Sequence, residues 1–433
     1  MQYGRMPATP IELAETPRRG AWGYSVLCLA IALPVFSFFP VTPKPDVAGD
    51  ALNASRLTEF ALLLGSAYVL TNIAVVRRYA FNMRGHVVTV SSLYIGWAMC
   101  STLWSRNPLY TFGKSLEFFL LVYIAALVVV CYRRLPTPPR HGIEGLIIAA
   151  ALVTIALALA SNAILWDNPL HFHYNEGRVR LSFGYSHPLE TGDFCAVIAL
   201  VAFSSSLSSF ARILVTSLTG TIVYLTDSRS TLIFLILGLC VGVVMRTKSF
   251  GARLVSTAAA GVVIYAGAVF FIQGNLTFLP PDIVTLNTRT VLWHESLEIA
   301  YAHLLLGVGY FDTGEYLVPL FEWAGNAHNA YLEAILATGL IGLFLLLVFL
   351  AYSVWLCVKT KNHALVVVLL FVAAESIFNP LLLSPRTPML VLILLMLGGS
   401  ECRPAVASGA RSGDGSRRPP LQMTDRFRLP GRA

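Results

Sequence analysis

One histidine and three arginines have the residue types and positions that could carry out group transfer at a membrane surface. His328 lies immediately before an apolar run that continues to Val358. A neutral histidine titrates near physiological pH and can accept a proton from a hydroxyl group. Arg180, Arg229 and Arg289 carry permanent charges that match phosphate oxygens. Together these groups could bind a diphosphate, stabilise it as a leaving group and activate an attacking hydroxyl without a metal ion.

Each of these residues also has a purely structural interpretation. Arginines at a membrane rim often only reach lipid phosphates, and Arg229 could pair with Asp227. His328 could belong to the start of the following helix, with Asn329 as its cap. From the sequence alone both interpretations stay open.

Other polar residues are weaker candidates. Glu375 lies in an apolar run, where an acidic residue indicates proton handling or helix packing. A metal site would require four residues of one loop, His171, His173, Glu176 and His187. A His-x-His pair in a loop is weak support for zinc, so we expect no metal and no cofactor.

The composition predicts a polytopic helical membrane protein. Of the 433 residues, 56% are hydrophobic and only 12% are charged, which is more apolar surface than a soluble chain of this length can bury. The apolar runs do not alternate as the strands of a membrane barrel would. We therefore predict an all-α fold with about twelve spans. They are 21–39, 57–76, 87–103, 116–130, 143–165, 189–207, 213–225, 232–245, 254–272, 330–358, 365–383 and 389–397.

The placement of basic residues predicts the orientation. If the N-terminus is inside, most of the 31 lysines and arginines lie on inner segments. The rule that inner loops are basic then puts both termini in the cytoplasm. The net charge of +8 reflects insertion into the bilayer and contact with anionic lipids, and we expect no nucleic-acid partner.

The chain is predicted to form one membrane domain, 21–400, between a cytoplasmic arm (1–20) and a disordered cytoplasmic tail (401–433). Both ends are rich in Pro, Gly, Ser and Arg, a composition that does not form a core. The long outer loop, 273–327, contains the signal for an amphipathic helix that begins after Asn287-Thr288. Its apolar face would consist of Trp293, Leu297, Ala300 and Leu304. We expect this helix to lie on the outer membrane surface.

Four motifs follow one another along the second half of the chain. They are the tight turn Ser228–Ser230, an Arg-x-x-x-Trp helix from Arg289, the segment Leu305–Tyr310, and Ala327–Glu333 followed by Gly339 and Gly342. Over residues 180–347 their order resembles the O-antigen ligase and Wzy-type polymerase superfamily of bacterial envelope glycosyltransferases.

The resemblance implies a twelve-helix inner-membrane protein with a large periplasmic loop between the ninth and tenth spans. Members transfer a glycan from undecaprenyl diphosphate to a sugar hydroxyl, on lipid A-core or on another lipid-linked glycan. In the family's pattern His328 matches the proposed catalytic base. Arg180 and Arg229 match arginines thought to hold the diphosphate, and Arg289 matches the arginine that begins the loop helix. Further candidates for substrate binding are Arg178, Asn329, Tyr331, His187 and Glu190.

One departure from the family pattern affects these assignments. The family often has Gly-His-Pro-Asn after its first arginine, whereas this chain reads Ser186-His187-Pro188-Leu189-Glu190. The missing asparagine weakens the assignment of a functional role to His187, and Glu190 could differ in role from the family's residue. It also favours a polymerase slightly over a standard ligase.

Partners would be the lipid-linked glycan, an acceptor glycan or lipid A-core, the bilayer, and a flippase with a chain-length regulator. A secondary transporter is a second class of function, since many have twelve spans, but the chain shows no repeated halves. A non-catalytic component of polysaccharide export is a third.

Overall fold

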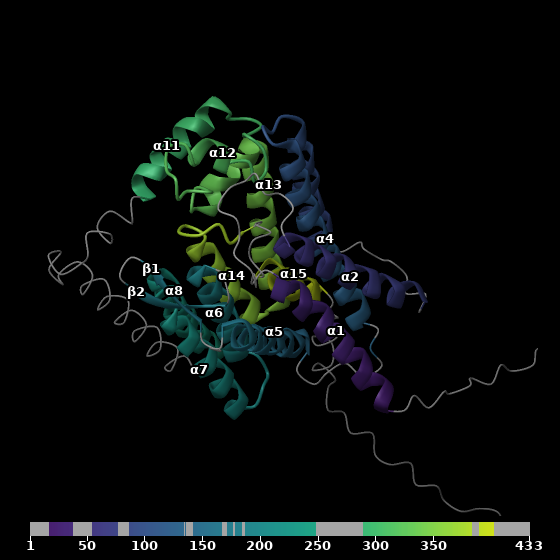
Figure 1. Ribbon diagram of the computed structural model, residues 1–433. Coiled ribbons are helices and arrows are strands. Elements are labelled where there is room, and N and C mark those ends of the chain that lie inside the picture. The colour runs from purple at the N-terminus through teal and green to yellow at the C-terminus, as the bar shows by residue number, and fades with distance from the viewer. Residues whose placement is uncertain are drawn as a thin grey trace, which may run out of the picture.

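The computed structural model describes residues 17–37, 54–76, 86–133, 135, 142–166, 171–175, 178–183, 187–247, 289–382 and 389–401. Within these ranges the regular secondary structure is helical apart from one two-stranded antiparallel sheet. Figure 1 shows α13 running through the middle of the molecule, with α11 and α12 at one end of the view and α7 at the other.

The helices follow the apolar runs of the sequence. In chain order they are α1 (Pro17–Ser37), α2 (Ala54–Val76), α3 (His86–Cys100), η1 (Ser101–Leu103), α4 (Pro108–Arg133), α5 (Gly142–Trp166), α6 (Pro188–Ser204), α7 (Ser209–Leu225), α8 (Arg229–Arg246), α11 (Arg289–Ala302), α12 (Gly314–Leu317), α13 (Ala330–Thr360), α14 (His363–Glu375) and α15 (Met389–Glu401). All but one of the predicted spans overlap one of these helices, although the helix in the predicted span 365–383 ends at Glu375. The ninth, 254–272, lies outside the described residues, as do nearly all of the arm and the tail.

Five of the described helices are long and apolar enough to cross a membrane. Four more apolar helices are shorter, and a short span can cross by tilting, by thinning the bilayer or by lying inside the bundle. The chain is a multi-pass membrane protein, and helices suit that environment because they satisfy their own backbone hydrogen bonds.

The long helix α13 is broken at Gly339, where φ is 70° and ψ is −169°. A break of this kind frees carbonyl groups of the preceding turn, which then need other donors. The donors come from the loop before α12 and from α3. The pairs are Val308 N to Leu336 O at 2.9 Å, Gly309 N to Ala337 O at 2.9 Å, and Trp97 Nε1 to Thr338 O at 2.8 Å. The loop is thereby fixed against the bundle.

A buried aspartate fastens the same loop to the start of α4. Asp312 Oδ2 accepts hydrogen bonds from Ser105 Oγ at 2.9 Å and from Arg106 N at 2.7 Å. Tyr310 N donates to Ser101 Oγ at 2.8 Å. The part of the predicted outer loop that follows α11 is therefore an ordered part of the membrane domain.

Helix α11 forms where the amphipathic helix was predicted, but the predicted face is partly wrong. Its buried residues are Leu292, Ser296 and Ala300. Leu297 and Leu304 are exposed. The stripe is shifted because α11 packs against α13, and the partner decides which residues are covered. The exposed leucines suit a helix at a bilayer surface.

The segment between α5 and α6 contains the hairpin, an exception to the predicted all-α fold. Strands β1 (His171–Asn175) and β2 (Arg178–Ser182) are antiparallel, with His173 paired with Arg180. Strands of five residues are too short to stand out in a search for long apolar runs.

Candidate functional site

Two buried carboxyl groups join three helices that carry or adjoin the predicted site residues. Glu375, the last residue of α14, is fully buried, and its Oε1 accepts from Ser230 Oγ at 2.8 Å and from Asn379 Nδ2 at 2.9 Å. Asp193 of α6 accepts from the same amide at 3.2 Å and from Thr231 Oγ1 at 2.7 Å. We call Asp193, Ser230, Thr231, Glu375 and Asn379 the acidic network. It ties α6, α8 and the end of α14 together.

Arg229 is the first residue of α8, after the tight turn from α7, and it directly precedes Ser230 and Thr231 of the acidic network. Asp227 in this turn has a left-handed backbone, with φ of 49°. Arg180 of β2 holds the turn, because its Nε donates to Thr226 O at 2.9 Å and its Nη2 to Asp227 O at 3.5 Å. The side chain of Arg229 is exposed. The structure thus brings Arg180 to within two residues of Arg229.

Arg289 begins α11 and lies in the same electrostatic environment. Burial lowers its pKa, and the positive charge of Arg180 lowers the pKa further. The carboxyl groups of Glu375 and Asp193 act in the opposite direction. The guanidinium groups of Arg289 and Arg180 repel each other, so an anion placed between them would be stabilised.

The position of His328 is set by hydrogen bonds to the backbone of Ala327, the residue before it. Ala327 N donates to Glu333 Oε2 at 2.8 Å, and Ala327 O accepts from Trp293 Nε1 at 3.0 Å. The histidine itself has a left-handed backbone, with φ of 48°, which histidine tolerates better than most residues. Its ring packs against Trp323 with centroids 5.6 Å apart.

The segment with His328 is attached to the end of α14. Asn329 is the N-cap of α13, since its Oδ1 accepts from Tyr331 N at 3.0 Å and Leu332 N at 3.1 Å. Ala330 N donates to Ser376 O at 2.8 Å, beside Glu375 of the acidic network. Tyr331 Oη donates to Ala373 O at 3.0 Å. Asn329 is therefore the cap of α13, as the structural interpretation expected, and His328 is the residue just before that cap.

The remaining candidates lie near the start of α6 and in the hairpin. His187 caps α6, with Nδ1 accepting from Leu189 N at 3.2 Å. Glu190 is in the first turn of α6, and Arg178 is in β2 opposite Asn175.

The alternative of a metal site concerned the loop between α5 and α6, which contains the hairpin. His171 and His173 lie in β1, and Glu176 is outside the described residues. No group of three or more His, Cys, Asp or Glu that could hold a metal ion occurs in the described part of the chain.

Sequence reasoning missed Asp193 and the positioning role of Glu333. The rule that singled out Glu375, an acid within an apolar helix, applies equally to Asp193. Glu333 lies in the first turn of α13, where an acid usually indicates a helix start. Only the fold shows that it also holds Ala327 and Thr313.

The site and the fold define a class: a multi-pass membrane protein in which three arginines and the segment of His328 lie around one buried acidic network. Residues 214–347 match the model of the O-Antigen ligase family, Wzy_C. This range includes Arg229, Arg289 and His328, and the match confirms the predicted resemblance for this part of the chain.

A particular relative is similar to this chain. The Exopolysaccharide production protein ExoQ of Rhizobium meliloti (strain 1021) is 35% identical over 131 residues. The similarity covers 26% of this chain and 29% of that protein.

Proposed function

We propose that this protein is a metal-independent, inverting glycosyltransferase of surface polysaccharide synthesis. It transfers a glycan from undecaprenyl diphosphate to a sugar hydroxyl at the periplasmic face of the inner membrane. Both termini are then cytoplasmic, and the loop that contains α11 and α12 is periplasmic.

In this reaction the arginines and the histidine have separate tasks. Arg180, Arg229 and Arg289 bind the diphosphate and stabilise the charge that develops as it leaves. The acceptor oxygen forms a bond to the anomeric carbon while the bond from that carbon to the diphosphate oxygen breaks. His328 takes the proton of the acceptor hydroxyl. Undecaprenyl diphosphate leaves from the opposite side, so the anomeric configuration inverts.

One observation carries the proposal: segments far apart in the chain meet at the acidic network. Ser230, the residue after Arg229, donates to Glu375. Ala330, two residues after His328, donates to Ser376. The charges of Glu375, Asp193 and Arg180 all act on the pKa of Arg289. Arginines that served lipid anchorage alone would not need to lie near the same acids that the segment of His328 adjoins.

Polymerisation is the preferred form of the reaction. The similarity to an exopolysaccharide production protein favours adding repeats to a lipid-linked glycan over ligation to lipid A-core. A flippase and a chain-length regulator are the partners that such a polymerase would need. Ladders of product with lipid-linked acceptor would support polymerisation, and transfer to lipid A-core alone would support ligation.

The test of the base is His328→Asn in protein purified into lipid nanodiscs. Asparagine tolerates the left-handed backbone at this position, so folding should be kept. We expect kcat for glycan transfer to fall by about 10²-fold or more, because a general base contributes on that order. The donor KM should change little.

The matched control is His363→Asn, at an exposed position at the start of α14. It should transfer glycan at the wild-type rate. Wild-type transfer by His328→Asn would rule out the base and favour a non-catalytic export component. Substrate-dependent proton flux by the wild type, with no glycan product, would indicate a transporter.

A further inference from the structure

A pocket lies beside the segment that carries His328, and Asn326 of that segment is among its lining residues. One wall is the face of α13 formed by Ala330, Glu333, Ala334 and Ala337. Tyr331 points from a different face of the helix to α14, where the acidic network begins. The first turn of α13 thus separates the pocket from the proposed diphosphate site.

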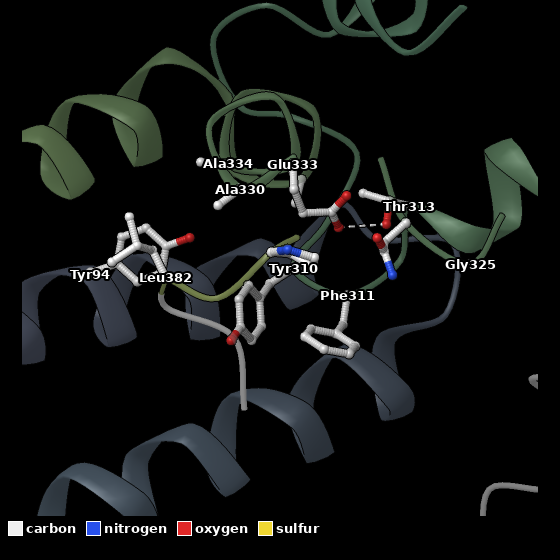
Figure 2. Close-up of a pocket in the computed structure, with 12 residues that line it drawn as sticks. Tyr94, Tyr310, Phe311, Thr313, Gly325, Ala330, Glu333, Ala334 and Leu382 are labelled. Atoms are coloured by element: carbon white, nitrogen blue, oxygen red, sulfur yellow. Dashed lines mark hydrogen bonds between the residues drawn. The ribbon is translucent and has the colours of Figure 1, made fainter. Parts of the chain in front are cut away.

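The pocket has an aromatic side and a polar side (Figure 2). Tyr94, Tyr310 and Phe311 form the aromatic side, with the Tyr310 and Phe311 ring centroids 5.3 Å apart. Thr313 and Glu333 lie across from them and are joined by a hydrogen bond of 2.7 Å. Binding pockets commonly combine an apolar lining with a few placed polar groups. Sugars have this same division, with apolar C–H faces and a rim of hydroxyl groups.

The polar side of the pocket is coupled to His328. Asn326 lines the pocket, and its Oδ1 accepts from His328 N at 2.8 Å. Its Nδ2 is a donor that can serve a bound hydroxyl group. Glu333 lines the pocket and also fixes Ala327, the residue before His328. A hydroxyl bound on this side would lie next to Asn326, two residues before the proposed base.

We propose that this pocket binds the acceptor, as a sugar residue whose attacking hydroxyl faces His328. The proposal rests on the proposed function. An inverting displacement requires the acceptor and the leaving diphosphate on opposite sides of the anomeric carbon. Arg289 lies near the acids of the network and near Arg180, which holds the turn before Arg229. The pocket lies on another face of α13, and His328 is in the segment just before that helix.

The small residues of α13 offer a test, since they leave the pocket open. Ala334→Met would place a longer apolar side chain in the acceptor space without removing any polar group. The matched control is Ala351→Met, the same change on the same helix at an exposed position. Methionine and alanine are both good helix formers, so the helix should persist in both variants.

The assay uses the lipid-linked oligosaccharide extracted from membranes of the source organism as donor. The same oligosaccharide, released from its lipid diphosphate, is the soluble acceptor. We expect Ala334→Met to raise the acceptor KM about tenfold or more, which corresponds to loss of roughly 1.4 kcal/mol of binding. The donor KM should stay within about twofold of the wild-type value. Ala351→Met should change neither.

A second variant guards against misfolding of the first. Phe311→Leu removes the aromatic face but keeps an apolar side chain, and it should raise the acceptor KM in the same way. An unchanged acceptor KM in either folded variant would overturn the proposal. A rise in the donor KM alone would overturn it too, by assigning the pocket to the donor glycan. Absence of transfer by the wild type would instead overturn the proposed function, and the acceptor site with it.

Discussion

At the scale of single residues, the structure places its strongest constraints on the neighbours of His328. Ala327 has both its backbone groups held, one by Glu333 of α13 and the other by Trp293 of α11. Asn329 on the other side is used as a helix cap. The histidine is therefore positioned through the backbone, in a left-handed conformation that flanking hydrogen bonds must maintain.

Glu333 should act as a positioning residue whose effect depends on its two acceptor oxygens. Glu333→Ala removes both hydrogen bonds, to Ala327 N and Thr313 Oγ1. Hydrogen bonds to charged groups are worth about 1.5–3 kcal/mol, so we expect kcat to fall roughly 10- to 100-fold. Glu333→Gln should restore most of the rate, because its amide can accept from Ala327 N and donate to the hydroxyl of Thr313.

The readout is kcat against donor KM in nanodiscs, with Glu315→Ala, at an exposed position of α12, as control. A role in folding alone predicts that thermal stability and rate fall together in both Glu333 variants. Equal losses in the alanine and glutamine variants would contradict a positioning role.

At the scale of elements, the break in α13 is what docks the outer loop onto the bundle. A Cβ at Gly339 would lie 2.1 Å from Leu305 O. A Cβ at Gly307, across the contact, would lie 2.5 Å from Ala337. The close approach allows Val308 and Gly309 to donate to the freed carbonyls, and it fixes the loop that leads to the pocket.

Gly339→Ala should therefore destabilise the protein. The backbone at this position is nearly restricted to glycine, which costs about 1–3 kcal/mol for another residue, and the clash adds to this. Gly96→Ala in α3 is the matched control, since nothing lies within 4 Å of its added Cβ, and alanine favours a helix by about 1 kcal/mol. Thermal unfolding in detergent should show a lower Tm for Gly339→Ala only. Equal Tm values for the two variants would contradict the docking role of the break.

The elements also show what sequence reasoning could reach. Hydropathy found the apolar helices because lipid favours long apolar segments, and a capping pattern found α11. The hairpin was missed because its strands are short. The covered face of α11 was partly wrong because α13 determines it. The acids of α6 and α14 carry a signal in the sequence, but hydropathy holds no information on which loops meet, so their link through Asn379 could not be predicted.

At the scale of the whole molecule, the acidic network lies on the donor side of the proposed site. Its two acids, Asp193 and Glu375, lie close enough to Arg289 to act on the pKa of that residue, as does Arg180. The acceptor pocket lies on another face of α13. Donor and acceptor would therefore meet at the start of this helix, where His328 precedes its cap.

The most direct test of the central claim is a cryo-electron microscopy structure of the protein in nanodiscs with undecaprenyl diphosphate. The account predicts diphosphate density in contact with the guanidinium groups of Arg180, Arg229 and Arg289, at the hydrogen-bonding distance of about 3 Å. The tail should enter the bilayer, and His328 should face the free phosphate end. Diphosphate density bound elsewhere, or His328 turned away from it across the helix, would contradict the claim.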